Sequence, residues 1–484
     1  MSAIASLEPK TVWEIFDAIT QVPRPSKREG KIIDFLIAFA EKHGIEYRKD
    51  ATGNIVMRKP ATPGYESRPA VILQAHMDMV CEKNSDVEFD FDEDPIRTRI
   101  DGEWVKAEGT TPGPDDGIGM AAALAVLVDP ASEHGPVEAL FTVDEETGLT
   151  GAFGLGEGML EGKYLINLDS EDEGEIFIGC AGGVDTVATF RYATEEAPKN
   201  YAYFRLGVSD LVGGHSGDDI DKGRANSNKI AARLLWEGMQ SFGLRLSCFD
   251  GGNLRNAIPR EAYAVFGVRE HAKDEFLKRF RLFAEEVKAE FKFSEPKLEL
   301  SLVELPSVDT VLDAASQRAL VYALVGVPNG VIAMSQAMPG LVETSTNLAS
   351  VKFVGDGRIV VTSSQRSSVE SAKTYVMRMV ESVFALAGAD VVHSDGYPGW
   401  APDPQSKLLA VTKECYRERF GVEPKVRAIH AGLECGLFLE KYPGLEMVSI
   451  GPTLRGVHSP DERLEIATVP KFWNLLSDVL KRIR

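Results

Sequence analysis

The chain has 484 residues, more than one hydrophobic core usually supports, so we expect two or more domains. Its 44% hydrophobic and 26% charged residues are typical of a water-soluble globular protein. Lys and Arg number 53 against 73 Asp and Glu. The resulting charge of −20 argues against nucleic acid or a membrane surface as a partner.

The first twenty residues contain no basic segment followed by an apolar one, so they do not predict a secretory signal. No apolar run reaches the roughly 18 residues that a membrane-spanning helix needs. The five cysteines are scattered and lack CxxC spacing, which is typical of thiols in a reducing compartment. Together these observations predict a cytoplasmic protein.

The N-terminal part of the chain alternates helices with short apolar strands. Helices are predicted at 11–20, 27–43 and 117–128, and strands at 54–59, 70–74, 137–143 and 164–168. A continuous apolar run such as AVILQ at 70–74 is typical of a strand buried on both faces. The pattern predicts an α/β fold, a mostly parallel sheet flanked by helices.

The pattern changes near residue 184, where alternating strands and amphipathic helices begin. The order helix, strand, strand, helix occurs at 226–242, 244–248, 262–268 and 273–291, and again at 310–325, 344–354, 358–362 and 367–387. We therefore expect an inserted α+β domain at 187–387 that is internally duplicated. The first pattern resumes with a helix at 405–420, strands at 425–429 and 446–450, and a last helix near residue 469. The sheet domain is thus predicted to be discontinuous, 1–186 and 388–484.

Five segments bring His, Asp and Glu side chains to the ends of predicted strands or to tight loops. They are QAHMDMV (His76, Asp78), GTTPGPDDGIGM (Asp115, Asp116), FTVDEETG (Asp144, Glu145, Glu146), INLDSEDEGE (Asp169) and GPTLRGVHSPDE (His458). In open α/β sheets the functional crevice lies beyond the carboxyl ends of the strands, so we expect these side chains to meet there.

The residue types in these segments are those of a metal site. Imidazole nitrogens and carboxylate oxygens are ligands of catalytic zinc, and two metals about 3.5–4 Å apart need a bridging carboxylate with terminal ligands on each side. Taken alone, each segment has an ordinary explanation, such as a solvated acidic cluster or a helix cap. Their joint position favours a two-metal site instead. Its candidate ligands are His76, Asp115, Glu146, Asp169 and His458.

The same segments resemble the co-catalytic dizinc aminoacylase and carboxypeptidase superfamily, whose sheet domain has a zinc-peptidase-like fold and carries a lid domain. Longer stretches resemble the aminoacyl-histidine dipeptidases within it (bacterial peptidase D). These stretches are GTTPGPDDGIGMA, DEETGLTGA, DSEDEGEIFIGCAGG, GGHSGDD, LRNAIPRE, VETSTNL, YPGW, HAGLECG and GVHSPDE. They run from about His76 to Glu462. The resemblance implies metal-dependent hydrolysis of dipeptides, preferentially Xaa-His and including carnosine-like substrates.

The resemblance also implies a role for each matching residue of the metal site. Asp115 would bridge two divalent metal ions. His76 and Asp169 would complete the ligands of one metal, and Glu146 and His458 those of the other. Zinc suits this ligand set, although manganese and cobalt accept the same donors.

Three further residues are implied in catalysis. Glu145 would be the general base that takes a proton from the attacking water, Asp78 would orient His76, and His215 of GGHSGDD would stabilise the tetrahedral oxyanion. One position departs from the resemblance, since Asn is expected where this chain has Asp116. We expect that departure to alter the surroundings of the metals and not their ligands.

Substrate contacts are implied for five residues: Asn256, Arg260, Arg366, His430 and Glu434. An arginine suits a C-terminal carboxylate because its planar fork binds two oxygens at once. The partner is therefore expected to be a small peptide.

Two other readings of the sequence remain open. The chain could be a different amidohydrolase on the same scaffold, namely an aminoacylase, a tripeptidase or a carboxypeptidase. It could also be a catalytically silent binding protein, although such a protein should have lost ligands or the base, and all are present here. For assembly we expect a monomer or a homodimer, with His215 acting within its own chain.

Overall fold

The computed structural model describes residues 2–484. Contacts divide the chain into two compact units, each described by itself below. Unit 1 comprises Met1–Gly179, Pro402–Ala428 and Leu433–Arg484, and unit 2 comprises Cys180–Ala401 and Ile429–Gly432. The sequence-based domain bounds, 1–186 with 388–484 and 187–387, are not identical to the bounds of these two units, and they remain a prediction.

Unit 1 is built on an eight-stranded sheet. In hydrogen-bonded order its strands are β1 (Glu46–Lys49), β2 (Ile55–Lys59), β6 (Val137–Thr142), β3 (Val71–His76), β7 (Tyr164–Asn167), β23 (Glu446–Ser449), β8 (Glu175–Cys180) and β22 (Lys425–Ile429). The strands from β6 to β23 are parallel, and they form the centre of the sheet. The pairings β1–β2, β2–β6 and β23–β8 are antiparallel. For β1 and β2 the reason is the short connection, which cannot make the crossover that parallel strands require.

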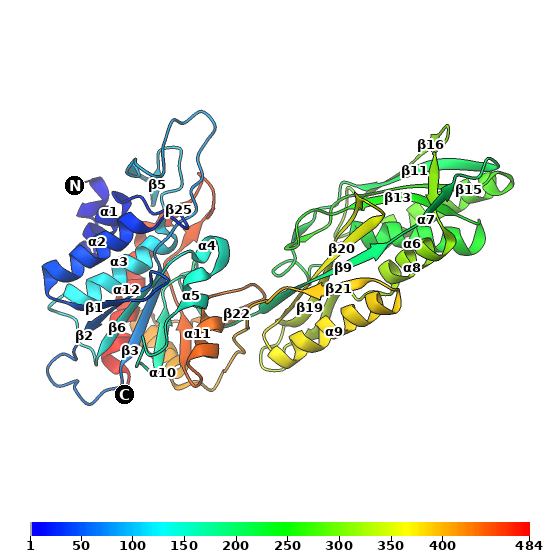
Figure 1. The fold of residues 1–484 in the computed structure, drawn as a ribbon. Helices are drawn as coiled ribbons and strands as arrows, with labels where there is room; N and C mark the ends of the chain where they lie inside the picture. The colour runs from blue at the N-terminus through cyan, green and yellow to red at the C-terminus, as the bar shows by residue number, and fades with distance from the viewer. Residues whose placement is uncertain (1) are drawn as a thin grey trace. The chain divides into compact units, whose positions relative to one another are not determined.

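Helices cover the sheet of unit 1. They are α1 (Lys10–Thr20), α2 (Gly30–His43), α3 (Pro114–Val128), α10 (Lys407–Phe420), α11 (Cys435–Lys441) and α12 (Val469–Arg482), with the short α4 (Glu145–Gly148) and α5 (Thr150–Gly154) and the 3-10 turns Ala3–Ser6 and Ile466–Thr468. Helices α1, α2 and α3 lie together beside the sheet, and α3 packs on β3 (Figure 1). Helix α10 packs on α12 and β23. Every residue of β3 and of β6 is buried, as their continuous apolar runs predict.

A second, four-stranded sheet in unit 1 carries the loop of His458. Its strands are β24 (Leu454–Arg455), β25 (Arg463–Glu465), β5 (Trp104–Ala107) and β4 (Thr98–Asp101), in that order. Among residues 2–484, no helix is both long and apolar enough to cross a membrane.

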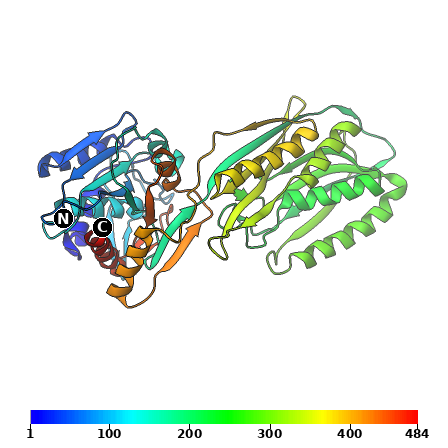
Figure 2. The ribbon, with the colours of Figure 1, turned by 90° about the horizontal axis from the view of Figure 1, so that it is seen from below.

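Unit 2 is built on a nine-stranded antiparallel sheet. The strands along its path are β16 (Glu299–Leu305), β11 (Tyr201–Ser209), β15 (Ala262–Arg269), β13 (Arg245–Gly251), β19 (Val342–Gly355), β20 (Arg358–Ser367), β9 (Gly182–Arg191) and β21 (Asp390–His393), and β18 (Gly330–Met334) pairs with β19. The helices are α6 (Ser227–Ser241), α7 (Lys273–Glu290), α8 (Ala314–Gly326) and α9 (Glu370–Leu386), with a 3-10 turn at Glu270–Ala272. Figure 2 shows the four long helices side by side on the sheet.

The expected duplication is present in the topology of unit 2. One repeat runs β11–α6–β13–β15–α7–β16, and the other runs β9–α8–β19–β20–α9–β21. Both are βαββαβ units with the strands in the order fourth, first, third, second, and the antiparallel pair β13–β19 joins them. The first repeat is inserted in the second, after its opening strand β9 and a short strand at Thr194–Glu196.

The sequence-based prediction of a helix at 310–325 was wrong at its start. Thr310–Leu312 forms a short strand, β17, which pairs with β10 (Thr194–Glu196). Helix α8 begins only after Asp313, whose side chain accepts a hydrogen bond from the backbone N–H of Ser316. The helix therefore starts at this Asp cap and not at the β-branched residues before it.

Candidate metal centre and substrate-binding residues

The parallel centre of the unit 1 sheet brings most of the predicted ligands together. His76 is the last residue of β3, whose neighbours are β6 and β7. Beyond β6, Asp144 adopts a left-handed backbone conformation (φ 50°), and the chain turns directly into α4 with Glu145 and Glu146 at its start. Asp169 follows the end of β7 by two residues.

Asp115 lies between the two candidate histidine ligands. Its Oδ1 atom is 3.0 Å from Nε2 of His76, and its Oδ2 atom is 3.2 Å from Nε2 of His458. Asp115 lies at the start of α3, where it and Asp116 have non-helical backbone angles, and a cis peptide bond joins the two residues. One carboxylate thus contacts both imidazoles through different oxygens, the arrangement of a bridging ligand.

Each imidazole also faces a second carboxylate. Nε2 of His76 is 3.6 Å from Oδ1 of Asp169, and Nε2 of His458 is 3.1 Å from Oε2 of Glu146. The side chains form two groups of three, and within each group the ligand atoms all lie within 4.8 Å of one another. Both groups include Asp115. The groups are His76, Asp115 and Asp169, and Asp115, Glu146 and His458.

The donor set fits two divalent cations. Oε1 of Glu146 is buried without a hydrogen-bond partner among residues 2–484, although a buried carboxylate oxygen is costly to leave unpaired. Hydrogen bonds to Asp115 and Glu146 raise the pKa of His458 to about 11. Burial disfavours the charged form of His76, but Asp169 and Asp115 outweigh burial and raise its pKa well above the usual value. The carboxylates here outnumber the cationic side chains, and two divalent metal ions would supply the missing positive charge.

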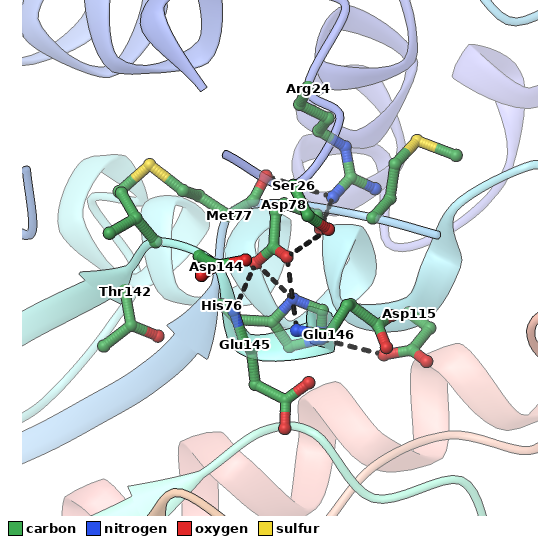
Figure 3. A network of polar contacts seen from close by, with 12 residues as sticks. Arg24, Ser26, His76, Met77, Asp78, Asp115, Thr142, Asp144, Glu145 and Glu146 are labelled. Carbon is green, nitrogen blue, oxygen red and sulfur yellow. Dashed lines mark hydrogen bonds and ion pairs between the residues drawn. The ribbon is translucent and has the colours of Figure 1, made fainter. Parts of the chain in front are cut away.

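Asp78 links His76 to the segment that carries Glu145. Its Oδ1 atom is 3.3 Å from Nδ1 of His76 and accepts the backbone N–H of Glu145 at 3.0 Å. Its Oδ2 atom accepts the backbone N–H of Glu146 at 3.3 Å and the hydroxyl of Ser26 at 2.8 Å (Figure 3). A carboxylate on the far nitrogen of a ligand imidazole fixes its orientation and leaves Nε2 to the metal.

Glu145 lies beside the candidate ligands. Burial raises its pKa well above the usual value, and Asp169, Glu434 and Glu146 reinforce this effect while His76 opposes it. A carboxyl group whose pKa is raised accepts a proton more readily than an exposed one, which suits a general base.

Asp116 is buried, and its Oδ1 atom accepts the backbone N–H of Gly119. It therefore caps the first turn of α3 behind Asp115. Burial raises the pKa of Asp116 well above the usual value, with Asp169 and Asp115 adding to the effect and His76 opposing it.

Glu434, a predicted substrate contact, ends a polar chain that crosses the sheet and that the sequence analysis missed. Its Oε2 atom accepts from Nε2 of Gln74 at 2.7 Å and from Oγ1 of Thr142 at 2.8 Å. Gln74 accepts from Asn167, which accepts from Ser449. Burial raises the pKa of Glu434 to about 8. The available signal was one amide residue in each of two otherwise mostly apolar strands, Gln74 in β3 and Asn167 in β7.

A further group of buried carboxylates, Glu29, Asp78 and Asp144, has ordinary partners. Glu29 accepts the backbone N–H groups of Lys27 and Asp144, and Asp144 accepts the hydroxyls of Thr147 and Thr150. These bonds fix the turn after β6.

His215 lies in unit 2, in the two-residue strand β12 (Gly214–His215), which pairs with β14 (Ala257–Ile258). Its Nδ1 atom accepts the backbone N–H groups of Gly217 and Asp218 at 3.3 and 3.2 Å. The ring proton is therefore on Nε2, which leaves Nε2–H as a donor. Oδ2 of Asp218 also lies 3.3 Å from Nδ1, and the proximity of His215 lowers the pKa of Asp218.

Arg366 and His430 are buried in unit 2. Nη1 of Arg366 donates to the hydroxyl of Tyr397 at 3.0 Å, while its Nε atom has no partner among residues 2–484. Nε2 of His430 lies 2.7 Å from Oγ of Ser345. Burial lowers the pKa of His430 to about 4, and the nearby charge of Arg366 adds to this effect. The Nε–H of Arg366 is thus buried and unpaired, and such a guanidinium donor suits an anionic acceptor.

Asn256 and Arg260 are exposed in unit 2. The carbonyl of Asn256 accepts the backbone N–H of Ser216 at 2.8 Å, so Asn256 is adjacent to the His215 loop. Nε of Arg260 donates to the carbonyl of Leu211 at 3.0 Å, a bond that joins the segment after β14 to the loop that precedes β12.

The chain is similar to known peptidases over its whole length. The chain is 44% identical over 483 residues to the cytosol non-specific dipeptidase of Escherichia coli (strain K12), covering 100% of this chain and 99% of that one. It is also 44% identical to the aminoacylhistidine dipeptidase of Vibrio alginolyticus, whose crystal structure matches with a TM-score of 0.95 over 100% of this chain and 98% of that one.

A tripeptidase from Staphylococcus aureus matches with a TM-score of 0.57 at 14% identity, over 99% of each chain, which shows a shared fold. The model of peptidase family M20/M25/M40 matches residues 72–482. The predicted superfamily, the predicted fold and the predicted class of enzyme, a metal-dependent peptidase, are thereby confirmed. The chain belongs to peptidase family M20/M25/M40.

Proposed function

We propose that this protein hydrolyses dipeptides with the help of two divalent metal ions, in the first place zinc. One observation carries the proposal: the two oxygens of Asp115 contact the imidazoles of His76 and His458, and each imidazole faces one further carboxylate. Asp169 would complete the ligands on the His76 side, and Glu146 those on the His458 side.

The metals, when bound, polarise the scissile carbonyl and acidify water. Glu145 takes the proton of the attacking water and delivers it to the leaving amine, as its raised pKa favours. Asp78 holds His76 and the backbone of Glu145 in register with each other. The buried carboxylate of Asp78 thus contacts both a proposed metal ligand and the segment of the proposed base.

His215 and Arg366 have complementary tasks in this proposal. The Nε2–H group of His215 donates to the oxyanion that forms on the carbonyl oxygen. The guanidinium of Arg366, held through Nη1 by Tyr397, receives the C-terminal carboxylate of the dipeptide. His430 and Glu434, with Asn256 and Arg260, are proposed as further substrate contacts.

The preference for a C-terminal histidine belongs to the same proposal. The two relatives at 44% identity differ in their names, one a non-specific dipeptidase and the other an aminoacylhistidine dipeptidase. We infer an Xaa-His preference from the second of these, with a small peptide as the partner. The cytosolic relative also supports a cytoplasmic location.

The test removes the metals with a chelator and restores zinc, manganese or cobalt in turn. Ala-His, Gly-His, β-Ala-His, Ala-Leu, a tripeptide and an N-acetyl amino acid are then assayed. Metal-dependent cleavage led by the histidine dipeptides supports the full proposal. Equal cleavage of Ala-Leu removes the histidine preference. A leading tripeptide or N-acetyl amino acid would make the chain another amidohydrolase, and no hydrolysis by folded, metal-loaded protein would overturn the enzymatic role.

A further inference from the structure

Arg24 lies in the loop between α1 and α2, and only 2% of its surface is exposed. Burial lowers its pKa, while the neighbouring Asp78, Glu462 and Asp115 raise it. A guanidinium is charged at any ordinary pH, so burying it is costly unless its N–H groups find acceptors. The acceptors that its N–H groups contact therefore indicate the role of Arg24.

The guanidinium donates to backbone carbonyls in both segments that carry ligands. Nη1 donates to the carbonyls of Met77 at 3.2 Å and Asp78 at 2.5 Å, directly after His76 (Figure 3). Nη2 donates to the carbonyl of Gly113, two residues before Asp115. One side chain thus ties the end of β3 to the start of α3.

The space around the guanidinium is closely fitted. A Cβ atom added at Gly113 would lie 2.6 Å from Nη2 of Arg24, and one added at Gly117 would lie 2.7 Å away. Gly113 also has a φ of 70°, which disfavours other residues there. Glycines on both sides of Asp115 therefore leave room for this side chain.

The backbone of the Arg24 segment has attachments of its own. The carbonyl of Arg24 accepts the N–H of Met79 at 3.1 Å, and Pro25 pairs with Met79 in a parallel bridge. Ser26 donates to Asp78. These bonds should keep the loop in place when the guanidinium is removed, so its effect can be measured separately.

The guanidinium of Arg24 lies close to the proposed metal ligands but forms no ion pair with their carboxylates. Among the ion pairs of residues 2–484 there is none between Arg24 and a carboxylate within 4.0 Å, because its donors are taken by carbonyls. The positive charge lowers the repulsion between Asp78 and Asp115, and the carboxylate oxygens remain available to a metal.

We propose that Arg24 is a positioning residue that holds the His76 and Asp115 segments in the geometry for metal binding before the metals arrive. This inference rests on the proposed two-metal function. Removing partners that orient metal ligands typically weakens metal binding 10- to 100-fold. We therefore expect Arg24→Met to weaken zinc binding by at least about tenfold.

The experiment measures zinc dissociation constants of the apoproteins by competition with a chromophoric chelator. Arg24→Met removes the positive charge and all of the guanidinium donors. Arg24→Lys keeps the charge, but a single ammonium group cannot donate to both segments. Both variants should bind zinc more weakly than the wild type, and Arg24→Lys more tightly than Arg24→Met. In Arg24→Ala, added methylguanidine should restore much of the affinity, which a general loss of stability would not allow.

Arg58 provides the matched control. It also donates to a backbone carbonyl, that of Met159, and pairs with Glu138 and Glu161, but it contacts no ligand segment. Arg58→Met should bind zinc within about twofold of the wild type.

Zinc binding within twofold of the wild type by Arg24→Lys and Arg24→Met would overturn the inference, as would an equal loss in Arg58→Met. If Arg24→Met does not fold, Arg24→Lys and the methylguanidine rescue decide. A wild-type protein that binds no divalent metal would instead overturn the proposed function.

Discussion

Nδ1 of His76 lies 3.3 Å from Oδ1 of Asp78, on the edge of the imidazole opposite to Asp115. The same carboxylate accepts the backbone N–H groups of Glu145 and Glu146. One buried side chain therefore contacts a candidate metal ligand and fixes the segment of the proposed base.

Asp78→Asn should weaken metal binding by about 10- to 100-fold, because the amide presents a weaker acceptor to His76 and to the two N–H groups. Isothermal titration of the apoprotein with zinc measures the effect. Asp50→Asn is the control, since Asp50 accepts backbone N–H groups in a distant turn. Equal affinities of Asp78→Asn and wild type would remove the proposed role of Asp78.

Glu145→Gln should lower kcat by about 10²- to 10⁴-fold, because the amide cannot accept the proton of the attacking water. Bound metal, measured by elemental analysis, should stay at the wild-type amount. Glu157→Gln, at an exposed position of the same unit, should keep full activity. A variant at position 145 that lost its metal as well would be a ligand variant, contrary to the proposed role.

Arg366→Met should raise KM for dipeptides, since it removes the donor for the C-terminal carboxylate. The corresponding dipeptide amides, which lack this negative charge, should be affected little. Arg358 on the same strand is exposed and pairs loosely with Asp356, so Arg358→Met serves as the control. Equal losses for acids and amides would argue for a structural role of Arg366.

His430 should make stability depend on pH. Its folded pKa of about 4 lies below the ordinary value of 6.5, so between these values the unfolded state binds more protons. This contribution is fully present above pH 6.5 and is lost as the pH falls toward 4, by up to about 1.4 kcal/mol per pH unit.

Unfolding temperatures of the wild type and of His430→Asn between pH 7 and pH 4.5 measure this slope. The variant should show a flatter decline, because the buried imidazole beside Arg366 is gone. Parallel curves would mean that other groups account for the dependence.

His215→Ala should lower kcat by about 10²- to 10³-fold, the usual effect of losing one oxyanion donor. If His215 acts within its own chain, mixing His215→Ala with Glu145→Ala should restore no activity. Restoration in hybrid dimers would show that it acts across a subunit interface.

The parallel centre of the sheet and the meeting of the candidate ligands at its edge could be predicted because they leave local signals. Each central strand is an apolar run, and parallel strands end at one edge, so polar residues after two such runs must meet. His76 and Asp169 follow this rule directly. The recurrence of helix, strand, strand, helix likewise predicted the two repeats of unit 2.

Arg24 could not be predicted in this way. Its partners are backbone carbonyls 53 to 89 residues away, and a carbonyl carries no residue type that a sequence pattern could register. Its surroundings, PRPSKREG, also read as a polar turn between two helices. The hydrogen bond from Gln74 to Glu434 joins residues 360 positions apart, and a local sequence pattern could not predict it either.

The nesting of the two repeats sets an order in which the chain can complete its parts during synthesis. The inner repeat has all its strands once β16 has left the ribosome, and it can then fold as a unit. Strand β9 is made earlier, yet it must wait for β20 and β21, which begin at residues 358 and 390. The sheet of unit 1 waits longer still, because β22 and β23 follow both repeats. Unit 1 is therefore started first and finished last. Its strands β1, β2, β6, β3 and β7 can pair by residue 167, but one edge of β7 and both edges of β8 stay unpaired until β22 and β23 are made, and unpaired edges are prone to aggregation.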